Sequence, residues 1–240
     1  MPMKRIAFIF LVILWFTSCQ ESPLEDSISE VTTESELDII SRGMLPVERI
    51  FAFTSPLTSD QKLFLFRCLQ SLEEKYPELE DVISYIVDNR GPILFKMNPY
   101  LDADAAYDSY TIEFRDEFCI EDERVLEEIL HAAQDIAYGY EMIRFSRKNV
   151  EFEVRVLRDI WEYRRALREG LPIIDLRGSK LSSYRAWIFS LTLQNLLQAS
   201  IPQFNELAEG WHDPLYDGPN LFFNPDFTPR ILKYFASSQL

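Results

Sequence analysis

Apolar residues recur at helical spacing over most of the chain from residue 59 onwards, and this spacing predicts a mainly helical fold. Residues 93–97 are predicted to form a strand, and residues 110–114 alternate as a second strand does, with an Asp-rich loop expected between them. The class predicted is α+β, a single domain with a small antiparallel sheet beside a helical body. The helices are expected at 59–72, 79–86, 122–140, 149–169, 182–207 and 230–235.

The first 18 residues have a different pattern. Lys4 and Arg5 precede an uninterrupted apolar run at 6–16, and Thr17 and Ser18 follow it. This is the layout of a secretory signal peptide, and the run is shorter than the roughly 20 apolar residues that a membrane-spanning helix needs.

The residues around the end of this run resemble a bacterial lipobox, in which small residues stand directly before a cysteine. Thr17 and Ser18 precede Cys19, although Phe16 occupies the place of the usual Leu. The resemblance implies that the Cys19 thiol is lipidated after cleavage and anchors the protein to a membrane. The alternative is a plain signal peptide with an incidental cysteine.

The segment after Cys19 is acidic and rich in Ser and Thr, so it has little apolar surface to bury. We expect a signal peptide at 1–18, a flexible tether at 19–36 and one folded domain at 37–240. The resulting location is the bacterial cell envelope, on the periplasmic or the cell-surface side, with the membrane as partner through Cys19.

Charge and cysteine content narrow the function further. Without residues 1–18 the chain has 24 − 2 = 22 basic and 39 acidic residues, a net charge of −17. We therefore expect no nucleic-acid binding, because neutralising phosphates needs a basic surface. Cys68 and Cys119 are too few for a disulfide scaffold, and two buried apolar thiols are favoured over a pair.

One segment carries candidate chemistry. Residues 126–134, LEEILHAAQ, follow a strand and lie in a predicted helix. They resemble the zinc motif H-E-x-x-H of zincin metallopeptidases, of the gluzincin type, over roughly residues 93–160. Glu128 matches the catalytic general base and His131 the second histidine ligand, but Glu127 stands where the first histidine belongs. The resemblance implies a zinc site that is degenerate.

Two further features belong to this resemblance. The strand at 110–114 would be the sheet edge along which such enzymes lay an extended peptide. The ending from His131 to Gln134 resembles the H-A-x-Q variant of zincin-like lipoproteins.

The third metal ligand has two candidates, Glu151 and Glu153, which follow His131 by 20 and 22 residues. Family spacing favours Glu151. Helical phase favours Glu153, because it lies among apolar positions, where a carboxylate needs a partner. In the family an Asp often follows the ligand Glu by four residues, whereas Arg155 follows Glu151 here.

A simpler interpretation of the same residues is a solvated helix face. Glu127, His131 and Gln134 share one side of their helix, away from its apolar stripe, where a Glu–His pair can simply decorate the surface. His212, the only other histidine, could replace the missing ligand or be an ordinary loop residue.

The sequence thus predicts a membrane-anchored lipoprotein with a degenerate or restricted metallopeptidase-type site. Whether it is an enzyme stays open, because a zinc-dependent peptidase would lack its first histidine. The alternative is a non-enzymatic helical module that binds a peptide or protein partner at the cell envelope.

Overall fold

The structure is a computed structural model, which describes residues 46–172, 176, 178–179, 182–194, 201–212 and 221–236. The expected signal peptide, Cys19 and the tether lie outside these residues. All the elements below belong to one compact unit, residues 43–240.

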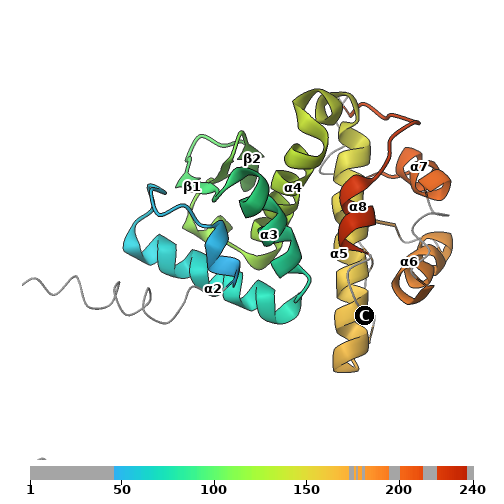
Figure 1. The fold of residues 1–240 in the computed structure, drawn as a ribbon, viewed down its shortest axis with the longest axis horizontal. Coiled ribbons are helices and arrows are strands. Elements are labelled where there is room, and N and C mark those ends of the chain that lie inside the picture. Colours follow the sequence, from blue (N-terminus) through green and yellow to red (C-terminus); the bar gives the residue numbers. More distant parts are fainter. Residues whose placement is uncertain are drawn as a thin grey trace, which may run out of the picture. The chain divides into compact units, whose positions relative to one another are not determined.

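Helices dominate the described part of the chain, so the α+β class is confirmed (Figure 1). Short 3₁₀ turns, η1 and η2, lie at Pro46–Ile50 and Glu117–Cys119. The α-helices are α2 (Ser59–Lys75), α3 (Leu79–Arg90), α4 (Asp122–Phe145), α5 (Arg147–Glu169), α6 (Ser182–Gln194), α7 (Ile201–Glu209) and α8 (Arg230–Phe235).

The sheet has three strands in the order β1-β3-β2, and it is mixed, so the prediction of a purely antiparallel sheet is wrong. β1 (Leu94–Met97) pairs with β3 (Thr111–Phe114) in parallel, while β2 (Ala105–Asp108) pairs with β3 antiparallel. β2 lies in the segment expected to be a loop. It adds one chain reversal between the two strands that the sequence predicted, and this extra reversal makes those two strands parallel.

A tight hairpin connects β2 to β3 through Ser109 and Tyr110, both at positive φ (46° and 73°). Two-residue hairpins favour such conformations because their twist matches that of the strands. The side chains of Phe95, Ile112 and Phe114 are completely buried, so one face of the sheet contributes to the core.

Helix α5 is central to the helical part of the fold. It packs against α4, α6, α7 and α8, and Figure 1 shows it between α4 and the pair α6 and α7. Consequently most of its residues are buried on every side, including charged ones. Helix α4 in turn packs against α2, α3 and β2, which places it between α5 and the sheet.

Two helix boundaries differ from the prediction. The helix expected at 182–207 is two helices, α6 and α7, and Pro202 lies in the first turn of α7, where its missing N–H is tolerated. Helix α4 reaches Phe145 but is broken at Gly139, whose φ of 73° and ψ of 163° only glycine adopts readily. Among the described residues no helix is long and apolar enough to cross a membrane.

Cys68 and Cys119 are buried and unpaired as thiols. Each donates a hydrogen bond to a carboxylate, Cys68 to Asp122 and Cys119 to Asp116. The interpretation of two buried thiols is therefore confirmed.

Candidate metal centre

Three of the predicted site residues come together between α4 and α5. One potential ligand atom from each of Glu127, His131 and Glu151 lies within 4.8 Å of the other two. Their side chains are 4%, 17% and 9% exposed, so the group is shielded from bulk water. Two carboxylates and one imidazole in this arrangement could hold a metal ion.

The helical repeat explains the grouping. Glu127 and His131 are four residues apart on α4, so they lie one turn apart on the same face. Helix α5 packs against that face and presents Glu151. The interpretation of a solvated surface face is wrong, because Glu127 and Gln134 are buried under α5.

Glu127 is held by two arginines of α5. Arg155 bonds both of its oxygens, at 3.0 and 3.1 Å, and Arg158 bonds Oε2 at 2.8 Å. All three side chains are almost fully buried. Bidentate guanidinium–carboxylate pairs are among the strongest hydrogen-bonded contacts, and here they fix the carboxylate and neutralise its charge.

His131 has a partner at each ring nitrogen. Nδ1 lies 2.8 Å from Oε1 of Gln134, and Nε2 lies 3.4 Å from Oε2 of Glu151. Burial disfavours the charged imidazolium, but the nearby carboxylates of Glu151, Glu128 and Glu127 outweigh burial and raise the pKa of His131 to about 10. In the metal-free protein His131 is therefore an internal cation that donates to both neighbours.

Gln134 fixes the orientation of His131. Its Nε2 donates to the backbone oxygen of Val150 at 2.8 Å and to Glu153 at 3.0 Å, which leaves Oε1 to accept from Nδ1 of the histidine. The other ring nitrogen then faces Glu151. Metal-binding histidines are commonly oriented by a second hydrogen bond of this type.

Glu128, the candidate general base, lies close to the same group but is bonded to the sheet. The backbone N–H of Tyr107 in β2 donates to its carboxylate. Burial, with further contributions from Glu127 and Glu151, raises the pKa of Glu128 to about 7 against the lowering effect of His131. The neighbouring strand is thus β2, not the 110–114 strand that the sequence pointed to.

Glu153 lies outside the three-residue group. It is fully buried, and its oxygens accept bonds from Tyr138 Oη at 2.8 Å, Gln134 Nε2 at 3.0 Å and the Leu232 N–H at 3.0 Å. Burial raises its pKa to about 7, although these donors lower it. The phase argument identified a buried carboxylate that needs partners, and the partners come from α4 and α8. His212 is exposed and is not part of the metal-competent group.

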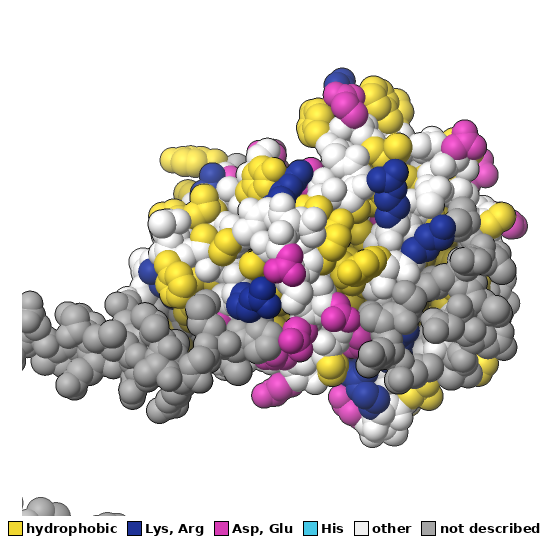
Figure 2. All heavy atoms as spheres, viewed as in Figure 1, with side chains coloured by type: hydrophobic (Ala, Val, Ile, Leu, Met, Phe, Trp, Pro, Cys, Tyr) yellow, Lys and Arg dark blue, Asp and Glu magenta, His cyan; other side chains and the backbone are white. Residues whose placement is uncertain are grey.

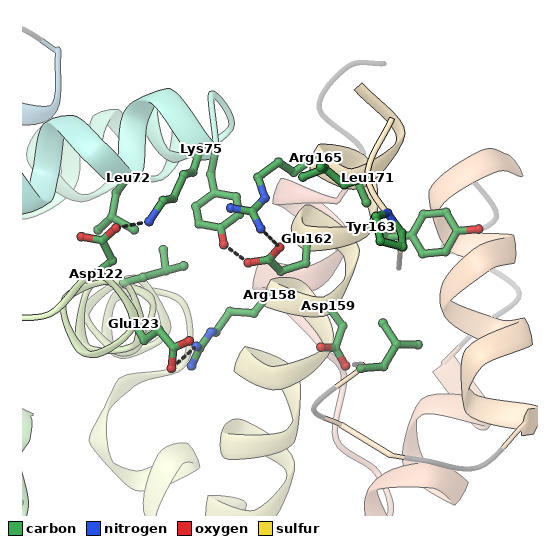
Figure 3. Close-up of a pocket in the computed structure, with 15 residues that line it drawn as sticks. Leu72, Lys75, Asp122, Glu123, Arg158, Asp159, Glu162, Tyr163, Arg165 and Leu171 are labelled. Atoms are coloured by element: carbon green, nitrogen blue, oxygen red, sulfur yellow. Dashed lines mark hydrogen bonds and ion pairs between the residues drawn. The ribbon is translucent and has the colours of Figure 1, made fainter. Parts of the chain in front are cut away.

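A cavity of about 460 Å³ lies between α2, α4 and α5 (Figure 3). Its lining includes Arg158 and Glu123, which form an ion pair at 3.8 Å, but not Glu127, His131 or Glu151. Glu162 accepts a hydrogen bond from Tyr76 Oη. Figure 3 shows Glu162 paired with Arg165, and Lys75 paired with Asp122. Arg158 both lines the cavity and bonds Glu127, so it connects the cavity to the candidate centre.

Comparison of the chain with protein-family models, with curated proteins and with solved structures finds no match.

The sequence analysis did not identify the residues that neutralise Glu127 or that bond to Glu128 and Glu153. Arg155 and Arg158 follow Glu151 by four and seven residues, so helical phase places all three on one side of the helix. That shared side could have indicated a common partner. Tyr107 acts through its backbone, and Tyr138 approaches Glu153 from another helix, so no local pattern identifies them.

We expect Arg155→Ala to lower the free energy of unfolding by about 3–5 kcal/mol, because it leaves Glu127 buried with one of its two guanidiniums removed. Urea denaturation followed by circular dichroism measures this loss. The matched control is Arg147→Ala. Arg147 is 57% exposed and lies 3.9 Å from Glu151, so its loss should cost at most about 1 kcal/mol.

The double variant Glu127→Gln, Arg155→Ala should lose less than the sum of its two single variants, because the pair is removed together. Strict additivity would show that the two residues do not interact.

Stability should fall as pH rises from about 5 to about 7. Burial raises the pKa of Glu128 and of Glu153 from the ordinary 4.5 to about 7, so the folded state binds more protons than the unfolded state in this window. Each group then contributes a slope of up to about −1.4 kcal/mol per pH unit. His131 extends the fall from 6.5 towards 10 with the same sign.

Urea midpoints measured across pH 5–9 test this dependence. Glu128→Gln removes one titrating carboxyl group. It should therefore reduce the slope of the unfolding free energy against pH between pH 5 and 7 by the contribution of up to one proton. A wild-type stability that rises across this window contradicts the burial argument.

Proposed function

We propose that the chain is an exported lipoprotein, held by lipid on Cys19 to a membrane of the bacterial cell envelope. Its domain is zincin-like, and the peptidase-type site has become a charge-paired core without hydrolytic activity. The protein acts by binding a peptide or protein partner rather than by cleaving it.

One observation carries this proposal: the two positions at which the sequence departs from the zincin pattern bond to each other. Glu127 replaces the first histidine, Arg155 replaces the Asp expected four residues after Glu151, and the pair is bidentate and buried. A metal ligand and its supporting carboxylate have thus been exchanged for an ion pair that stabilises the contact of α4 with α5 without an ion.

Charge balance supports the loss of zinc. Glu127 is bonded by Arg155 and Arg158, and Glu151 faces the protonated His131, so both candidate carboxylate ligands are already paired with cations in the metal-free protein. Both nitrogens of the imidazole are also engaged.

A restricted zinc-dependent peptidase is the second candidate. It is favoured by the close grouping of Glu127, His131 and Glu151 and by the Gln134 contact that orients His131. In that case Zn²⁺ would supply a polarised water beside Glu128, while the two carboxylates would make the ligand set harder than the usual one.

The lipid anchor is supported by the basic residues, the apolar run and the Thr17-Ser18-Cys19 sequence at the N-terminus. Cys19→Ala should abolish the lipid-dependent mass increase and release the protein from the membrane fraction, or leave it uncleaved. Mass spectrometry and fractionation measure both. A variant that is processed to an unchanged mass and remains membrane-bound overturns the anchor.

Elemental analysis of the purified full chain should find far less than one zinc per chain, and peptide hydrolysis should stay at the level of Glu128→Gln. Stoichiometric zinc that is lost in His131→Ala, with cleavage lost in Glu128→Gln, would establish the second candidate instead.

Restoring the pattern tests the zincin-like scaffold itself. Glu127→His combined with Arg155→Asp should raise zinc content towards one per chain, because it rebuilds the His₂Glu set and removes a competing guanidinium. Circular dichroism establishes that the variant is folded, and Glu127→His alone serves if it is not. A folded variant that binds no more zinc than wild type contradicts the hypothesis of a zincin-like scaffold.

A further inference from the structure

Four large apolar side chains are exposed near the end of α4. Tyr140, Met142, Phe145 and Phe222 are between 39% and 71% exposed. We call these four residues the aromatic tip. Figure 2 shows hydrophobic side chains on both sides of the protrusion where Figure 1 places the end of α4, with an acidic and a basic side chain between them.

The fold holds the tip in place. The break at Gly139 redirects the last turn of α4, which carries three of the four residues. Phe222 is fixed beside them because its backbone oxygen accepts from the Lys148 N–H at 3.1 Å. Asn224, two residues later, donates from its side chain to Ser146 Oγ at 3.0 Å. Hydrogen bonds thus hold the segments that carry the exposed rings.

Two exposed cationic side chains accompany the tip, in a chain of net charge −15. Arg144 and Arg147 are exposed, and the Arg144 guanidinium lies 5.5 Å from the centre of the Phe145 ring. Aromatic and Met side chains mixed with arginines are typical of surfaces that enter the headgroup layer of a membrane.

We propose that the aromatic tip is a second membrane contact, which inserts its apolar side chains among anionic lipid headgroups while Arg144 and Arg147 bind their phosphates. This inference rests on the proposed lipid anchor for its setting and is independent of the metal centre. Attraction to anionic lipid is a local property of the tip, because the chain as a whole is repelled.

Chain length limits how far the domain can lie from the anchored lipid. The 26 residues between Cys19 and Pro46 can span at most about 90 Å. Arg147 also lies one helical turn, about 6 Å along α5, from Glu151. A docked tip would therefore hold the candidate centre close to the headgroups.

Fluorescence quenching on vesicles tests the tip in the full, lipidated chain. The probe is Phe145→Trp, reconstituted on phosphatidylcholine vesicles with one third phosphatidylglycerol and brominated acyl chains. The described native tryptophans, 161, 187 and 211, are buried and give the background to subtract. The matched control is Phe118→Trp, at a position 82% exposed in η2, away from the tip.

Bromolipid should quench Phe145→Trp and shift its emission to the blue, but should leave Phe118→Trp unchanged. Adding Arg144→Glu and Arg147→Glu, or omitting the anionic lipid, should reduce the quenching. Equal quenching of both tryptophans, or none at residue 145, overturns the proposal. A blue shift in detergent that grows with protein concentration also overturns it and identifies a second copy as the occupant.

Vesicle flotation separates failure of the tip from failure of the anchor. Flotation retained without quenching at residue 145 eliminates the tip and leaves the anchor intact. If Cys19 proves not to be lipidated, flotation on anionic vesicles should persist weakly and be lost in Phe145→Asp. If the unlipidated wild-type chain does not float at all, the proposal for the aromatic tip is overturned as well.

Discussion

The burial of charged residues along α5 is the constraint on which the rest of the structure depends. A helix surrounded by four others would ordinarily be apolar, since an unpaired buried charge costs several kcal/mol. Here each such residue contacts an oppositely charged or polar group from another element, so α4, α8 and the segment before α6 are held by specific bonds as well as by packing. The residues concerned are Glu151, Glu153, Arg155, Arg158, Asp159 and Arg164.

The same constraint connects the fold to the proposed function. A zincin-type site joins two helices through an ion, and its ligands lose that connection when the first histidine is absent. The bidentate bond between Glu127 and Arg155 supplies a connection of the chain's own at the same place. A change at either residue alone would leave a buried charge, so Glu127 and Arg155, which the proposed function treats as replacements, are physically coupled.

Much of the fold follows from local patterns, whereas most of the site's chemistry does not. Apolar spacing located the helices and the strands β1 and β3, since both reflect which residues meet the core. It did not find β2, where Ala105 and Asp108 form a strand because of hairpin pairing with β3. The arginine bonds to Glu127 join residues 28 and 31 positions apart, and only the packing of α4 on α5 determines them.

Helical phase correctly predicted that Glu153 is buried and needs hydrogen-bond partners, but it did not determine the role of this carboxylate. A carboxylate among apolar positions must find donors, and it finds them in Tyr138, Gln134 and the start of α8. Gln134 also bonds His131, so the buried carboxylate and the histidine are connected through one amide whose two ends are both committed. Glu153 therefore orients the imidazole at one remove, and the residue that faces the imidazole directly is Glu151.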